Sequence, residues 1–267
     1  MKLIKKIKIE VEKNWKKQRN SKYIKKTINL LNKGKIKICK KINKKWKINN
    51  WIKKAIILYL KYTKKKYIKN KILCYFDKIN NKFTKNNKKE LENKNIRLTS
   101  LSLARFGSYI SKNTILMPCF INIGAYIGKN TLIDSWSTIG SCAYIGKNVH
   151  ISGGVGIGGV LEPINKKPVI IEKNCFIGAR SEIAEGVIIK KNSVISMGVY
   201  IGSSTKIFDR CKKKIYKGYI PKNSVVVPGS INKGKYSIYA PIIVKKRNKK
   251  TNRKIKINLN LRGKLKK

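Results

Sequence analysis

The sequence predicts a parallel β-helix, and two observations carry this prediction. Aliphatic residues recur at every sixth position from Tyr109 to Ile157, and the spacing resumes between Ile171 and Ile207. The position after the aliphatic residue is usually Gly, Ser or Ala. A six-residue period is typical of a β-helix, whereas α-helices and alternating strands have shorter periods. We expect the aliphatic side chains to point inward and their small neighbours to allow tight corners.

Residues 1–96 lack this period and predict a small, mostly helical N-terminal domain. Apolar residues recur there at helical spacing, and glycine and asparagine stand where helices would stop or start. We expect its aromatic and aliphatic residues to pack together in a core. The expected elements are helices over 3–15 and 24–31, a hairpin over 36–48, a helix that begins near Asn50, and a polar loop over 80–95.

The β-helix is expected over residues 97–232, followed by a C-terminal strand and basic tail, 233–267. The repeat loses its phase between Ile157 and Ile171, where two prolines interrupt regular pairing. We therefore expect a loop near 158–170, and a second loop near 209–218 before the phase returns. Loops that leave a rigid solenoid commonly carry function.

The composition limits the possible partners. The formal charge is +54, but only eight of the 65 basic residues are Arg, and Lys is enriched along the whole chain together with Asn and Ile. This pattern indicates AT-rich coding bias and no specific nucleic-acid partner. Six cysteines without a C-x-x-C pair, and a single histidine, predict free thiols and no metal site. No apolar run is long enough for a membrane span, so we expect a cytoplasmic protein.

Acidic residues are rare, eleven in all, so each one inside the repeat is a candidate for chemistry. Asp134 occupies the small-residue position of its hexad, and Glu182 lies close to Arg180. A carboxylate can accept a proton from an attacking amine. His150 is an alternative general base because imidazole titrates near neutral pH. The G-x-G-x-x-G pattern of residues 154–159 lies inside the repeat, where no helix can begin, so a dinucleotide site is excluded.

Several longer runs carry a resemblance to one family: 122–126, 139–143, 145–163, 174–182 and 194–202. They are similar to the tetrahydrodipicolinate N-succinyltransferase family of the diaminopimelate and lysine pathway. The resemblance implies a left-handed parallel β-helix and a homotrimer with active sites between neighbouring chains. It also implies transfer of a succinyl group from succinyl-CoA, as co-substrate, to the amine of the hydrated, ring-opened substrate. No permanently bound cofactor is expected.

The resemblance also assigns site residues. The family's substrate-binding arginine and aspartate fall on Arg97 and Asp134, and its second active-site carboxylate falls on Glu182. With three hexads per coil, the two acids lie about two coils, or roughly 10 Å, apart, which favours a site between chains. Weaker candidates for substrate contacts are Arg105, Arg180 and Ser141, and for the phosphates of CoA they are Lys245 and Lys246.

Two alternatives stay open. One is another CoA-dependent acyltransferase with the same repeat, such as a tetrahydrodipicolinate N-acetyltransferase or an enzyme that uses His150 as base. The other is a non-catalytic solenoid that binds polyanions through its lysines.

Overall fold

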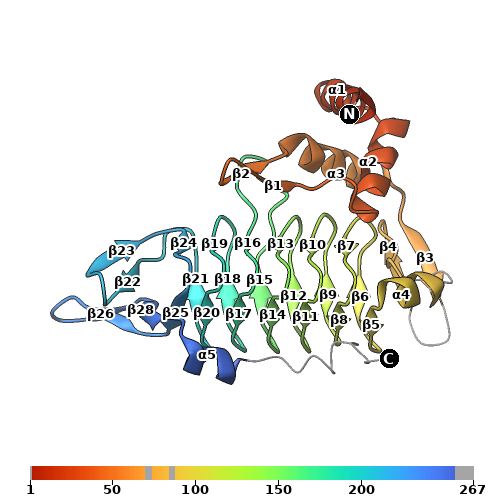
Figure 1. The fold of residues 1–267 in the computed structure, drawn as a ribbon. Coiled ribbons are helices and arrows are strands. Elements are labelled where there is room, and N and C mark those ends of the chain that lie inside the picture. The colour runs from red at the N-terminus through yellow and green to blue at the C-terminus, as the bar shows by residue number, and fades with distance from the viewer. Residues whose placement is uncertain (1, 70–73, 84–87, 256–267) are drawn as a thin grey trace.

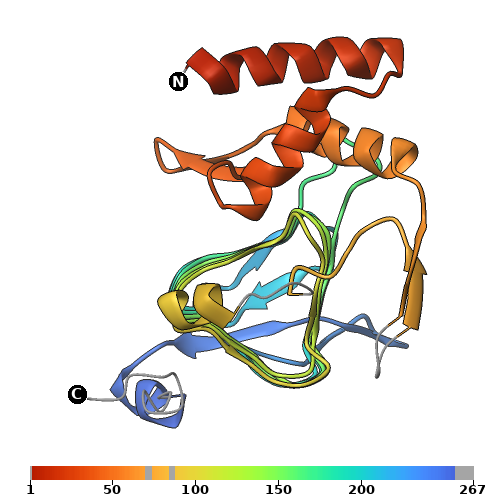
Figure 2. The ribbon, with the colours of Figure 1, turned by 90° about the vertical axis from the view of Figure 1, so that its right-hand side faces the viewer.

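The computed structural model describes residues 2–69, 74–83 and 88–255, and these fold into a three-sided β-helix with helices along one side (Figure 1). Viewed along its axis, the coils superimpose as a triangle (Figure 2). Three sheets form the sides, and the strands that stack between successive coils are parallel. The predicted parallel β-helix is confirmed.

We call the three sheets A, B and C. Sheet A contains β7 (Tyr109–Ile110), β10 (Tyr126–Ile127), β13 (Tyr144–Ile145), β16 (Ile170–Ile171), β19 (Ile188–Ile189) and β24 (Tyr219–Ile220). Sheet B contains β5 (Arg97–Leu98), β8 (Ile115–Leu116), β11 (Leu132–Ile133), β14 (His150–Ile151), β17 (Phe176–Ile177), β20 (Val194–Ile195), β25 (Ser224–Val227), β28 (Ile242–Lys246), β22 (Ile207–Asp209) and β23 (Lys214–Tyr216). Sheet C contains β6 (Leu103–Ala104), β9 (Phe120–Ile121), β12 (Thr138–Ile139), β15 (Gly156–Ile157), β18 (Glu182–Ile183) and β21 (Tyr200–Ile201).

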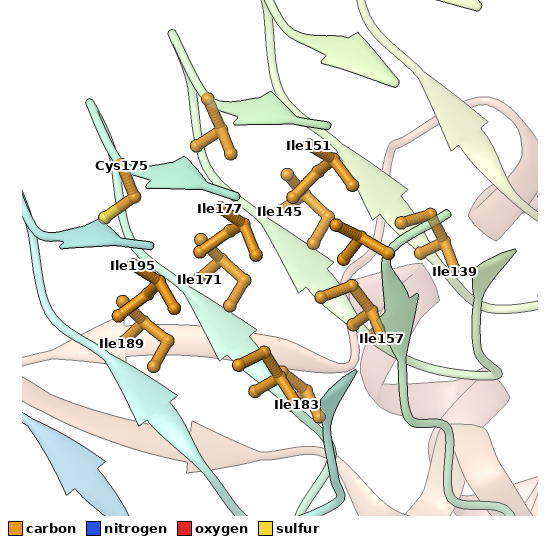
Figure 3. Packing of buried hydrophobic residues seen from close by; sticks show 14 of the residues in the cluster. Ile139, Ile145, Ile151, Ile157, Ile171, Cys175, Ile177, Ile183, Ile189 and Ile195 are labelled. Atoms are coloured by element: carbon orange, nitrogen blue, oxygen red, sulfur yellow. The ribbon is translucent and has the colours of Figure 1, made fainter. Parts of the chain in front are cut away.

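The core is a stack of isoleucines, one from each strand of a coil (Figure 3). Ile133, Ile151, Ile177 and Ile195 lie above one another in sheet B and are fully buried. Burial of one such side chain stabilises the fold by about 1.5–3 kcal/mol. The repeat therefore supplies its own core, coil by coil.

The start of the repeat differs from the prediction by one residue. Tyr109 and Ile115 were expected to point inward, but Ile110 and Leu116 are the fully buried residues of the first complete coil. Tyr109 instead pairs in register with the outward-facing Tyr126. The cause is a shorter corner at Met117–Cys119, where the inward positions Leu116 and Ile121 are five positions apart in the sequence and not six.

An asparagine ladder runs along the corner between sheets A and B. The side-chain amide of each asparagine donates to the amide oxygen of the next, at 2.9–3.2 Å. All members have φ between +47° and +63°, a left-handed conformation that Asn tolerates better than most residues. The ladder consists of Asn95, Asn113, Asn130, Asn148, Asn174, Asn192 and Asn223.

Residues 2–62 lie over sheet A and share a core with it, whereas Leu91 packs against the core of the β-helix itself. Outward residues of sheet A, among them Tyr144 and Ile170, pack against Trp46, Ile52 and Ile56. The predicted helices and hairpin are present, but the expected polar loop 80–95 contains a helix. The elements are α1 (Lys2–Lys17), α2 (Lys22–Asn32), β1 (Cys39–Ile42), β2 (Lys45–Ile48), α3 (Asn50–Tyr62), β3 (Lys66–Lys69), β4 (Cys74–Asp77) and α4 (Lys88–Lys94).

The chain leaves the β-helix in both places where the phase is lost, and the second place holds a strand hairpin where a loop was expected. Residues 158–169 connect β15 to β16, and β22 and β23 form a hairpin around the second interruption. After the hairpin β26 (Ser230–Asn232) and β27 (Ser237–Tyr239), strand β28 joins sheet B and α5 (Lys249–Lys254) follows. The rest of the predicted basic tail, 256–267, lies outside the described residues. In the part of the chain that is described, no helix has the length and apolarity to cross a membrane.

Candidate functional site

Asp134 lies at the corner between sheets B and C, directly after β11. Its Oδ1 atom accepts a hydrogen bond from the backbone N–H of Ser135 at 2.7 Å, so the carboxylate is fixed by its own turn. Its Oδ2 atom lies 3.9 Å from Nε2 of His150. The side chain is 36% exposed. Asp134 is therefore an oriented and accessible carboxylate.

His150 lies one coil further along sheet B. In the strand register it stacks between Leu132 and Phe176, and its ring centroid is 4.9 Å from that of Phe176. Its side chain is 19% exposed. His150 was expected only as an alternative base, and its position beside Asp134 was not predicted. The spacing in the sequence could have predicted this position. Residue 132, which shares a turn with Asp134, is 18 residues, or one full coil, before residue 150.

A cavity of about 690 Å³ continues along sheet B from this pair. It begins at Ser152, which follows β14 as Asp134 follows β11, and it passes over Phe176 and Val194. The far wall comes from the C-terminal segment, through Lys250 and Thr251 of α5 and Lys245 of β28. The cavity is largely apolar between its two ends, with lysines at the end away from Asp134.

The two lysines proposed for CoA point to different places. Lys245 lines the cavity on sheet B, whereas Lys246 lines a separate cavity beside Tyr219 on sheet A. Successive residues of a strand point to opposite faces, which explains the separation. Lys250, which was not predicted as a site residue, lines the same cavity as Lys245.

Glu182 lies on sheet C, with its side chain facing outward and exposed. Its carboxylate covers Gly156 of the neighbouring strand so closely that a Cβ atom on Gly156 would overlap it. Strand β18 is two strands from β12, which belongs to the coil of Asp134. The two acids therefore lie on two adjacent faces of the prism and two coils apart, as the residue count predicted.

Two of the three candidate arginines lie near the same corner. Arg97 is exposed on β5 in sheet B, two strands from Leu132. Arg180 is at the corner between sheets B and C, and its side chain lies against Gly154 of the preceding coil. Along the axis of the β-helix, Arg97 therefore lies before Asp134 and Arg180 lies after it.

The structure places Arg105 and Ser141 at another corner, between sheets C and A. Arg105 forms an ion pair with Asp77 of β4 and donates to Asn122 Oδ1 at 3.2 Å. Burial favours a raised pKa for the Asp77 carboxyl, but the hydrogen bonds from Arg105 and from the backbone of Lys78 and Ile79, together with the charge of Arg105, outweigh it, and the pKa is lowered. Ser141 is buried, and its carbonyl accepts from Val160 N at the start of the 158–169 loop. Neither residue is brought to Asp134.

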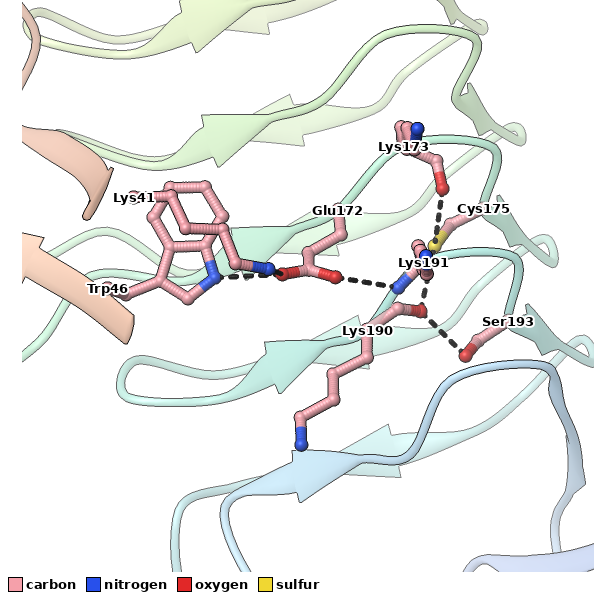
Figure 4. Close-up of polar contacts among 8 residues, drawn as sticks. All are labelled: Lys41, Trp46, Glu172, Lys173, Cys175, Lys190, Lys191 and Ser193. Carbon is pink, nitrogen blue, oxygen red and sulfur yellow. Dashed lines mark hydrogen bonds and ion pairs between the residues drawn. The ribbon is translucent and has the colours of Figure 1, made fainter. Parts of the chain in front are cut away.

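Glu172, another acid within the repeat, fastens the N-terminal hairpin to sheet A (Figure 4). Its Oε1 atom accepts from Trp46 Nε1 at 3.0 Å and from Lys41, and its Oε2 atom accepts from Lys191 N at 2.9 Å. Burial opposes ionisation, yet these donors lower the pKa of Glu172 below its usual value. No group of three or more potential metal-binding side chains occurs within residues 2–69, 74–83 and 88–255.

Comparisons with known proteins agree along the chain. A family model described as tetrahydrodipicolinate N-succinyltransferase N-terminal matches residues 6–62. A model of the bacterial transferase hexapeptide (six repeats) matches residues 124–159, and one of the hexapeptide repeat of succinyl-transferase matches residues 168–203.

Curated relatives match nearly the whole chain, and each of the following is a 2,3,4,5-tetrahydropyridine-2,6-dicarboxylate N-succinyltransferase. The protein of Buchnera aphidicola subsp. Baizongia pistaciae is 53% identical over 246 residues, which cover 92% of this chain and 90% of the relative. That of the Wolbachia of Brugia malayi is 54% identical over 90% of this chain and 88% of its own length. That of Acinetobacter baylyi is 50% identical over 87% of this chain and 86% of its own length.

Proposed function

The chain belongs to the tetrahydrodipicolinate N-succinyltransferase family, and from this premise we propose the reaction and the roles of its residues. The enzyme transfers the succinyl group of succinyl-CoA to the amine of hydrated, ring-opened tetrahydrodipicolinate. The products are N-succinyl-2-amino-6-oxopimelate and CoA, in the biosynthesis of diaminopimelate and lysine. The observation that carries this proposal is the identity of about one residue in two with these enzymes over nearly the full chain.

Asp134 supplies the proton acceptor for this reaction. The amine nitrogen attacks the thioester carbonyl, the new N–C bond forms, and the amine proton passes to Asp134 Oδ2. The C–S bond then breaks, and the proton leaves with the CoA thiolate. The backbone N–H groups of the glycine-rich corners are suited to stabilise the tetrahedral oxyanion. Glu182 is the second carboxylate, which binds or deprotonates the same amine.

Cationic side chains bind the anionic parts of the two substrates. Arg97 is the first partner for a substrate carboxylate because a planar guanidinium binds carboxylates through two parallel hydrogen bonds. Arg180 has a suitable position for the second carboxylate, and Arg105 is tied to Asp77. The apolar cavity on sheet B is suited to the pantetheine arm of CoA, with Lys245 and Lys250 at its far end for the phosphates.

The two acids act together if the protein is a homotrimer with sites between neighbouring chains. Exposed apolar side chains at the corner between sheets B and C support this arrangement: Leu101 is 59%, Trp136 70% and Met197 66% exposed. Tyr200, which pairs with Glu182 on sheet C, is 51% exposed. An interface along this corner would bring sheet B of one chain, with Asp134, to face sheet C of the next, with Glu182. Six free cysteines support a reducing, cytoplasmic environment.

The acyl donor tests the proposed reaction. Purified protein is incubated with tetrahydrodipicolinate and either succinyl-CoA or acetyl-CoA, and the released thiol is measured. We expect kcat/KM for succinyl-CoA to exceed that for acetyl-CoA at least tenfold, because a site built to bind the succinyl carboxylate leaves its polar groups unpaired when acetyl-CoA binds. A preference for acetyl-CoA would contradict the assignment in favour of an N-acetyltransferase. Binding of RNA without thiol release would favour a polyanion-binding solenoid.

A further inference from the structure

We propose that His150 is a positioning residue for the acyl transfer, which acts through Asp134. The imidazole orients Asp134 Oδ2 and sets the pH at which this oxygen can accept the proton of the amine. This inference rests on the proposed function, because it assigns the partner of the proposed proton acceptor.

The geometry singles out this histidine. Its ring faces outward on sheet B and packs against Phe176 in a tilted arrangement, with an interplanar angle of 44°, which limits its rotation, and its Nε2 lies toward Asp134. The Nε2–Oδ2 distance of 3.9 Å is longer than a hydrogen bond but short enough for an imidazolium and a carboxylate to interact electrostatically. Catalytic hydrogen bonds often have this length without substrate and become shorter in the reacting complex.

The two oxygens of Asp134 have separate partners. Oδ1 accepts from the backbone and hydroxyl of Ser135, at 2.7 and 3.4 Å, while Oδ2 faces His150. The turn therefore fixes one oxygen, and the imidazole lies beside the other. Because the cavity of sheet B begins at Ser152 on the next coil, a substrate amine that enters beside the cavity meets Oδ2 next to His150.

The charge of the imidazole decides whether Oδ2 acts as a base. A neutral imidazole donates from Nε2–H and leaves the carboxylate ionised and basic, whereas an imidazolium stabilises the carboxylate anion and lowers its proton affinity. The active state is therefore ionised Asp134 with neutral His150, and activity falls as the pH falls through the pKa of His150. The proton of the amine passes to Oδ2 and then to the thiolate, and the proton of the imidazole stays in place.

Few charged side chains surround the imidazole on sheet B. The Asp134 carboxylate faces it at 3.9 Å. The neighbours in the strand register, Leu132 and Phe176, carry no charge. Lys245 and Lys250 line the cavity beyond Phe176.

The first experiment titrates His150 by NMR in the full-length protein. It is the single histidine of the chain, so the imidazole C2–H gives one resonance without assignment. We expect its pKa to fall by about one pH unit in Asp134→Asn, from a carboxylate at this distance in a solvated site. Glu185→Gln, which removes an exposed carboxylate paired with Lys166, is the control and should leave the resonance unchanged. An equal pKa in wild type and Asp134→Asn would refute the coupling.

The second experiment compares the pH dependence of kcat in wild type and His150→Gln, whose amide N–H replaces Nε2–H. We expect the wild-type acid limb to lie in the imidazole range and to move at least one unit lower in the variant. We also expect kcat at pH 8 to fall about tenfold and KM for both substrates to change less than threefold. An unchanged limb would show that His150 only packs against Phe176, which would overturn the proposal.

The two experiments fail independently. His150→Phe, which keeps an aromatic ring beside Phe176, is the second variant if His150→Gln does not fold, and the same shift of the acid limb is expected. The NMR titration needs no substrate. Absence of activity with every acyl donor would therefore refute the proposed function. The NMR titration would still measure the coupling of His150 to Asp134.

Discussion

Asp134 and Glu182 are both unusual residues of the repeat, but the sequence reveals only the unusual position of Asp134. Asp134 stands where a small residue is usual, and the corner tolerates it because Ser135 N–H satisfies one of its oxygens. This departure is visible in the sequence. The surroundings of Glu182 are not visible in the sequence, because they depend on its pairing with Gly156. A loop of irregular length separates the two residues, so the sequence spacing does not show that they pair.

Gly156 provides a prediction at this scale. Gly156→Ala should displace the Glu182 carboxylate and lower kcat at least tenfold, because the new Cβ would overlap it. The backbone of Gly156 is not in a left-handed conformation, so the melting temperature should change little. Gly202→Ala is the control, since its Cβ would meet only Thr205 Oγ1 at 3.4 Å. Thiol release and thermal melting check both variants, and normal kcat in Gly156→Ala would exclude a role for the position of Glu182.

Among the structural elements, the corners explain which parts of the β-helix were predictable. The isoleucine period predicts the three sheets because every coil buries an isoleucine at the same position of each strand. The short corner at Pro118 shifts the phase by one residue, and no period reports the length of a single corner. Helix α4 was expected to be loop because its sequence is polar and it contributes no buried residue. It is supported by ion pairs such as Lys94–Glu90.

The asparagine ladder predicts the effect of a corner substitution. Asn148→Ala removes two side-chain hydrogen bonds and places Ala at φ +55°, so we expect a loss of about 2–3 kcal/mol in the free energy of unfolding. Asn148→Gly relieves the backbone strain and should lose about 1 kcal/mol less. Lys147→Ala, at the adjacent exposed position, should change it by less than about 0.5 kcal/mol. Urea unfolding measures all three, and equal stability of Asn148→Ala and wild type would contradict a stabilising ladder.

At the scale of the whole molecule, two buried lysines join the N-terminal elements to the β-helix. Lys53 of α3 donates to the carbonyls of Ile164 and Lys166 in the loop between β15 and β16. Lys82 donates to Asn32 at the end of α2 and to the Ser108 carbonyl in the first coil. Neither role was predictable among so many lysines, because composition does not show which ones the fold buries.

Lys82 makes stability depend on pH. Burial lowers its pKa from 10.5 to about 8. Between these values the unfolded chain binds a proton that the folded chain does not, so the free energy of unfolding rises with pH. Relative to Lys82→Met, the wild type should gain about 3 kcal/mol between pH 7.5 and 10.5. Chemical denaturation at both pH values measures the difference, and parallel pH profiles would contradict a buried, shifted lysine.

The central claim is that Asp134 of one chain and Glu182 of its neighbour form one succinyltransferase site. Asp134→Asn and Glu182→Gln should each lower kcat about a hundredfold or more. The most direct measurement is succinyl-CoA-dependent thiol release by trimers assembled from equal amounts of both variants after unfolding and refolding together. We expect about a quarter of the wild-type activity, because each site needs an intact Asp134 and an intact Glu182 from different chains. Mixed trimers that are as inactive as the two variants alone would contradict the shared site.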